Sequence, residues 1–68
     1  MTIQYHAQVL EDLKEVTPLQ ARMLLDYFEN KYTQSKQILE HSHVFQTGPW
    51  RILFYKEENA ITVLRIIQ

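Results

Sequence analysis

Residues 50–67 read WRILFYKEENAITVLRII, and this stretch decides the expected fold. Two runs rich in β-branched and aromatic residues, 50–56 and 60–67, are separated by the polar Glu57-Glu58-Asn59. Such runs joined by a short polar turn are typical of a β-hairpin. Alternate residues of the first run are largely apolar on both faces, which favours a central strand covered by helix on at least one side.

Two further stretches indicate strands. Val44 and Phe45 follow a change to β-forming residues at Ser42 and precede the turn-forming Thr47-Gly48-Pro49. At the other end of the chain, residues 2–5 alternate polar and apolar β-formers, which predicts a short edge strand.

Between these strands the apolar period becomes helical. A first short helix from Ala7 is indicated by one apolar set: Val9, Leu10, Leu13 and Val16. We interpret the acids of its other face as solvated: Glu11, Asp12 and Glu15. A second helix is expected to begin at Thr17-Pro18, because Thr caps free N–H groups and Pro is tolerated at the first position.

The second helix carries the clearest apolar stripe of the chain, formed by Leu19, Met23, Leu24, Tyr27 and Phe28. Of these we expect Leu24 and Phe28 to be buried against the hairpin. Ser35 is interpreted as the cap of a further helical turn through Ile38 and Leu39.

The predicted fold class is therefore α+β: an N-terminal strand, two helices, then a small antiparallel sheet of two to three strands, in a single domain over residues 1–68. The chain has 68 residues and no cysteine. A domain of this size buries only roughly 60% of its unfolded surface, so a protein partner or a homodimer would stabilise it.

Composition restricts the function. The net charge is −1 and the pI about 6.3, whereas domains that bind nucleic acid through phosphates are usually basic. No secretion signal or membrane-length apolar run is present in the sequence, which predicts a cytoplasmic protein with no membrane association. No cofactor-binding pattern, phosphate-binding glycine loop or zinc ligand set is found, so we expect neither cofactor nor metal.

The run Gly48-Pro49-Trp50-Arg51-Ile52-Leu53-Phe54-Tyr55, followed by residues 61–66, resembles the RelE/ParE superfamily of bacterial type II toxins, including its HigB-like and phage-derived branches. It is similar to the Gly-x-Tyr-Arg-Ile-x-Tyr strand of that family and its next apolar strand. Tyr5-His6-Ala7 and Leu10-Glu11-Asp12-Leu13 resemble the family's opening strand and first helix.

The resemblance implies a toxin-like component of a type II toxin–antitoxin system that binds a protein partner, with ribosome-dependent mRNA cleavage as the family activity. Arg51 matches the family's strand arginine, whose implied catalytic role is to hold a phosphate. Active members continue into a segment rich in Lys, Arg, His or Tyr, whereas this sequence stops at Gln68. We therefore expect a chain truncated at its C-terminus, with RNase activity left open.

The residues suggest one site besides Arg51. Arg51, Arg65 and Lys56 are expected to form a small anion-binding site, with a solvated arginine pair balanced by Glu57 or Glu58 as the alternative. His6, His41 and His43 are interpreted as exposed loop residues, with His41 or His43 as a general base beside Arg51 as a further hypothesis. Trp50, Tyr27, Phe28 and Tyr55 are interpreted as core, although aromatic rings also stack on bases.

A second class of function stays open on the sequence alone. A small non-enzymatic interaction or inhibitor protein, of phage or host, would use the same scaffold to occlude a larger target. Its binding would depend on exposed apolar and aromatic residues.

Overall fold

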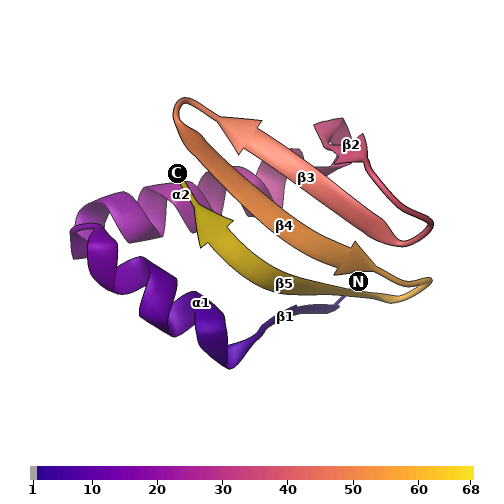
Figure 1. Cartoon of the computed structure of the whole chain (residues 1–68), viewed down its shortest axis with the longest axis horizontal. Helices are drawn as coiled ribbons and strands as arrows, with labels where there is room; N and C mark the ends of the chain where they lie inside the picture. The colour runs from indigo at the N-terminus through magenta and orange to yellow at the C-terminus, as the bar shows by residue number, and fades with distance from the viewer. Residues whose placement is uncertain (1) are drawn as a thin grey trace.

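The computed structural model describes residues 2–68, in which the helices lie on one face of a single sheet (Figure 1). Two 3₁₀ turns follow the helices, η1 after α1 and η2 after α2. The elements in chain order are β1 (Thr2–Tyr5), α1 (Ala7–Asp12), η1 (Leu13–Glu15), α2 (Pro18–Lys31), η2 (Tyr32–Gln34), β2 (Lys36–Gln37), β3 (Ser42–Thr47), β4 (Trp50–Lys56) and β5 (Ala60–Ile67).

The sheet has five strands in the order β1-β5-β4-β3-β2. β1 pairs parallel with β5, and every other neighbouring pair is antiparallel. The α+β class and the two helices are confirmed, whereas the predicted sheet of two to three antiparallel strands is wrong. Sequence pattern identified the strands from Ser42 onwards but not the pairing partner of β1, which lies almost sixty residues away.

The sheet also contains β2, a strand that the sequence pattern did not predict. In it Lys36 lies opposite Val44 and Gln37 opposite His43. The further helical turn expected here does not form. Ile38 and Leu39 instead belong to an exposed bend whose backbone N–H groups donate to the carbonyl of Ser42 at 2.9 and 3.2 Å. That bend returns the chain into β3, so local hydrogen bonds replace the expected helix.

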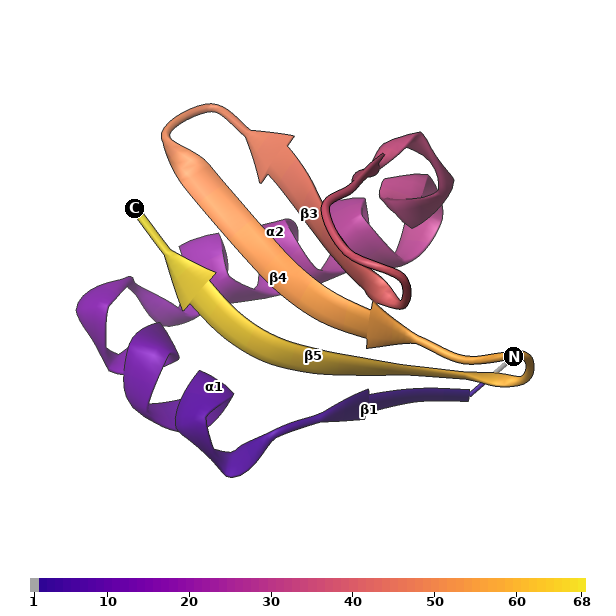
Figure 2. The ribbon, with the colours of Figure 1, turned by 45° about the vertical axis from the view of Figure 1, so that its right-hand side comes forward.

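α2 begins where the sequence predicts. The Thr17 hydroxyl accepts from the Gln20 backbone N–H at 3.2 Å, and the Gln20 side-chain oxygen accepts from the Thr17 N–H at 3.3 Å. This reciprocal pair is a capping box, which satisfies two backbone donors that the first turn leaves open. It fixes the start of α2, which runs behind the sheet in Figure 2.

The core lies between α2 and the inner face of β3, β4 and β5. Burial of Leu24 and Phe28 is confirmed, and the Phe28 ring meets those of Phe45 and Phe54 edge-on at centroid distances of 5.8 and 5.1 Å. The other buried apolar side chains are Val9, Ile52, Ile61, Val63 and Ile66.

Several residues predicted as apolar contacts are exposed instead. Leu10 in α1 is 65% exposed, and three of the five stripe residues of α2 also face solvent. Among the aromatic residues predicted to be core, Phe28 is fully buried and Trp50 half-buried, but Tyr27 and Tyr55 are exposed. A single helix buries about a third of its circumference, so one edge of a wide apolar stripe remains outside.

Candidate functional site

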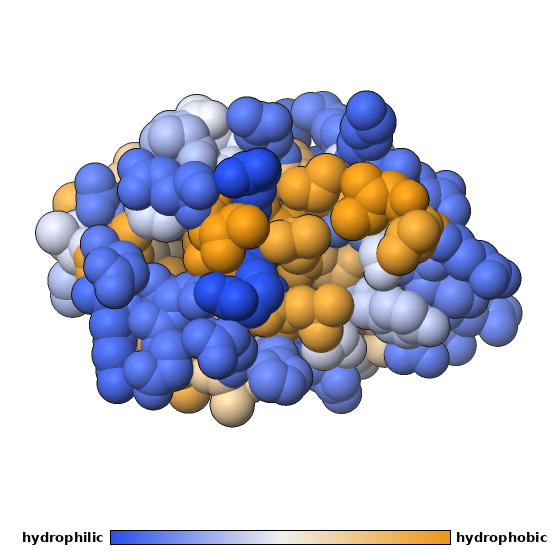
Figure 3. Space-filling model, viewed as in Figure 1, coloured by the Kyte–Doolittle hydropathy of each residue, from blue (hydrophilic) through white to orange (hydrophobic). Residues whose placement is uncertain are grey.

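The face of the sheet turned away from the helices is uncovered. Along β4, Ile52 and Phe54 are buried against α2, whereas the alternate residues Arg51, Leu53 and Tyr55 point to the other side and are partly or fully exposed. Figure 3 shows this face, with apolar side chains gathered in its middle between strongly hydrophilic ones. We call it the open face.

Charge is distributed unevenly between the sheet and the rest of the molecule. None of the five strands contains Asp or Glu, while β2, β4 and β5 contribute Lys36, Arg51, Lys56 and Arg65. All eight acids of the chain therefore lie in the helices, the 3₁₀ turns and the connections. The sheet is a locally cationic surface in a protein whose net charge is −1.

The strand register shows which of the predicted site residues come together. Arg51 lies opposite Ile67 and Arg65 opposite Leu53, so the two arginines are diagonal neighbours on adjacent strands. Such neighbours are roughly 7–8 Å apart. Lys56 pairs with the buried Ile61 at the other end of β4 and belongs to the opposite face. The structure thus brings Arg51 and Arg65 together without Lys56, and their anion-binding role stays a prediction.

Arg65 is held by Asp12 of α1. Its Nε and a terminal nitrogen donate to the two carboxylate oxygens at 2.9 and 3.0 Å, and the backbone N–H of Ile66 donates to the same carboxylate at 2.8 Å. Asp12 is 9% exposed, whereas the Arg65 side chain is 48% exposed. The interpretation of Asp12 as a solvated surface acid is therefore wrong.

These contacts determine the ionisation of the pair. Hydrogen bonding from Arg65, with a smaller contribution from the Ile66 N–H, outweighs burial and lowers the pKa of Asp12 to about 2. The carboxylate in turn raises the pKa of the Arg65 guanidinium. Asp12 also completes the edge of β5 beyond the end of β1, where Ile66 would otherwise have an unpaired donor. Its role is to join α1 to the sheet.

Arg51 is less constrained. One terminal nitrogen donates to the backbone carbonyl of Gln68 at 3.1 Å. Within residues 2–68 no Asp or Glu side chain lies within ion-pairing distance of Arg51, and its side chain is exposed. A guanidinium carries five N–H donors, so most of its hydrogen-bonding capacity remains for a ligand on the open face.

The histidines lie away from Arg51. His41 is exposed, with Nδ1 3.2 Å from the carbonyl oxygen of Lys56, and its ring contacts Tyr55. His43 is not a loop residue: it lies in β3 with its ring stacked on Phe54 at 5.2 Å. Both therefore sit toward the end of β4 opposite Arg51, which separates the proposed general base from the arginine. In the described part of the chain, no three His, Cys, Asp or Glu side chains are grouped to hold a metal ion.

His6 stabilises the start of α1. Its Nδ1 accepts from the Gln8 backbone N–H at 3.0 Å and caps α1.

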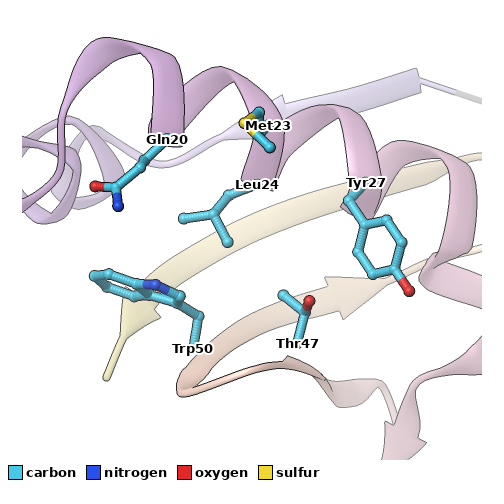
Figure 4. A pocket seen from close by; sticks show the side chains of 6 residues that line it. All are labelled: Gln20, Met23, Leu24, Tyr27, Thr47 and Trp50. Atoms are coloured by element: carbon cyan, nitrogen blue, oxygen red, sulfur yellow. The ribbon is translucent and has the colours of Figure 1, made fainter.

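An apolar pocket lies on the helical side of the molecule. Its volume is about 360 Å³, and it opens between α2 and the turn that joins β3 to β4. Leu24 and Tyr27 project from α2 toward Thr47 and Trp50, as Figure 4 shows, and Met23 also lines the pocket. The sequence indicated the apolar residues of α2 but not that they border a pocket, because the other wall comes from a distant turn.

Among residues 2–68 no helix combines the length and apolar character needed to cross a lipid bilayer.

No protein-family model and no curated protein sequence matches the chain. A chain in the crystal structure of the toxin–antitoxin complex RelBE2 from Mycobacterium tuberculosis has a similar fold, with a TM-score of 0.79 and 13% sequence identity. The superposition covers 96% of the present chain and 93% of that chain, so the likeness extends over the whole arrangement of helices and strands.

Proposed function

We propose that this chain is a toxin-like component of a toxin–antitoxin module, built as one RelE/ParE-like domain of the HigB-like or phage-derived type, and that it acts in the cytoplasm by binding a protein partner. The observation that carries the proposal is the fold shared with a chain of a toxin–antitoxin complex at a TM-score of 0.79. The strand pattern around Arg51, which resembles the toxin superfamily, supports it independently.

Ribosome-dependent mRNA cleavage is the finer part of the proposal. Arg51 is well placed to hold a phosphate, because it is exposed on an acid-free sheet and pairs with no Asp or Glu side chain among the described residues. Arg65 adds positive charge beside it but is occupied by Asp12. A guanidinium with open donors binds phosphate in a bidentate manner, which a Lys at the same position would not reproduce.

The test is expression of the chain with and without its neighbouring reading frame, followed by growth and transcript integrity. Growth arrest with mRNA cleavage that Arg51→Ala abolishes, and that the neighbouring frame relieves, supports the toxin. Lys31→Ala, which removes an exposed base from the end of α2, is the control and should leave the arrest intact. Arrest that persists in Arg51→Ala would refute the role of this side chain.

A second candidate is favoured by one observation. The open face also carries partly exposed apolar residues, Val44 and Leu53, which suit contact with another protein as well as with RNA. In this alternative the chain is a non-enzymatic inhibitor that occludes a larger target. Expression would then leave transcripts intact, and binding to the captured target would be lost in Leu53→Asp while Arg51→Ala has little effect.

A further inference from the structure

The outer side of α2 has exposed apolar residues at a regular spacing. Leu19, Met23 and Tyr27 follow one another at intervals of four positions and are 68%, 62% and 48% exposed. They form a continuous row along a helix of 14 residues and border the apolar pocket described above. A row of this kind marks a contact surface more often than single exposed apolar residues do. We call it the α2 row.

The spacing of the α2 row is complementary to itself. Each residue advances a helix by about 1.5 Å, so successive members of the row are about 6 Å apart along the axis. When a second α2 runs antiparallel, with the two-fold axis level with Leu24, its row is shifted along the helix axis by half that interval relative to the row of the first helix. The order along the contact is then Leu19, the partner's Tyr27, Met23, the partner's Met23, Tyr27 and the partner's Leu19, at steps of about 3 Å.

The charges beside the α2 row fit the same arrangement. Arg22 and Asp26 flank the row, with 3.9 Å between Arg22 Nε and Asp26 Oδ2, and their side chains are 82% and 68% exposed. These two positions are equally far from Leu24, so the two-fold axis that interleaves the row also sets Arg22 level with the partner's Asp26. A parallel pairing would set each charge beside its own kind, which is unfavourable. Apolar spacing and charge therefore select one register and one direction.

We propose that this protein forms a homodimer in which α2 packs antiparallel on the α2 of a second copy through Leu19, Met23 and Tyr27. A single helix of 14 residues spans about 21 Å. This is a small contact beside the ~800 Å² per partner of a standard stable interface, so the dimer is expected to dissociate on dilution.

Sedimentation equilibrium over a range of concentrations tests the dimer. We expect the average mass to rise toward twice that of the chain, and Met23→Glu to weaken association at least about tenfold because it places two carboxylates side by side at the two-fold axis. Leu10→Glu, at an equally exposed apolar residue of α1, is the matched control and should not change the association. A wild-type protein that stays monomeric at every concentration would overturn the proposal.

Cross-linking tests the register without depending on the stability of a charged variant. The chain has no cysteine, so a single introduced thiol reports one contact. Met23→Cys should oxidise to a disulfide-linked dimer, and Leu19→Cys should link efficiently only to Tyr27→Cys when the two variants are mixed. Leu10→Cys should not cross-link above background. Equal cross-linking at all of these positions would show random collision and refute the interface.

The charges give a third test. Arg22→Asp or Asp26→Arg alone should weaken the dimer, and the double exchange should restore it. Failure of the double variant to recover would refute the antiparallel register.

Discussion

Replacing Asp12 by Asn removes the charge of the carboxylate that joins α1 to β5 while keeping its size. In the native protein this carboxylate accepts from Arg65 at 2.9 and 3.0 Å and from the Ile66 N–H at 2.8 Å. The contacts lower the pKa of Asp12 from 3.8 to about 2. At about 1.4 kcal/mol per pKa unit the shift corresponds to about 2.5 kcal/mol. Water screens the half-exposed Arg65, so we expect a loss of about 1–2 kcal/mol for Asp12→Asn at neutral pH.

The pH dependence follows from the direction of the shift. Because the folded-state pKa lies below the unfolded value, the stabilisation is present above about pH 4 and is lost as the pH falls toward 2. Urea unfolding at a series of pH values should therefore show the wild-type protein losing its advantage over Asp12→Asn in that window. Glu11→Gln, one residue away in an exposed pair with Lys14, should change stability by less than about 0.5 kcal/mol. Equal stability of Asp12→Asn and wild type at pH 7 would refute the reasoning.

Three further substitutions test the packing, the helix start and the β3–β4 turn. Phe28→Ala should cost about 3–5 kcal/mol in thermal or urea unfolding, because it empties the centre of the aromatic core; an unchanged melting temperature would contradict the packing of α2. Thr17→Ala should cost about 1 kcal/mol and Thr17→Ser much less, since Ser retains the capping hydroxyl; equal losses would show that the hydroxyl is not the cause. Gly48→Ala should cost about 1–2 kcal/mol, because Gly48 has a φ of +56°, which a residue with a side chain adopts only under strain. No atom lies within 4 Å of the place that the Ala methyl would take, so a clash is not the cause. Identical thermal melts by circular dichroism for both proteins would exclude backbone strain there.

The parts of the fold that sequence predicts are those specified by neighbouring residues. Thr17 and Pro18 locate the start of α2, and alternation with the polar turn at Glu57-Glu58-Asn59 locates β4 and β5. β2 has only two residues, Lys36 and Gln37, and both are polar and exposed. Its strand conformation depends on β3, so no local pattern indicates it.

In the candidate site, too, the sequence predicts only what neighbouring residues specify. Arg51 is identified by its position in the strand, and its exposure follows from alternation with buried neighbours. The prediction for Asp12 is wrong because acids normally face water, yet Asp12 stands three residues after Val9, within the spacing of the buried side of α1. A lone acid at that position is a signal for a buried partner. The partner itself, Arg65, is specified only by the fold.

The parallel pairing of β1 with β5 has a consequence for synthesis of the protein. Thr2–Tyr5 is synthesised almost sixty residues before the strand against which it lies, Ala60–Val63. Asp12 likewise waits for Arg65 and Ile66. At 5–20 residues per second, β1 and α1 spend several seconds without their partners. The sheet therefore closes only after Ile66 has been added, and contacts so distant in sequence make this closing step slow compared with formation of α2.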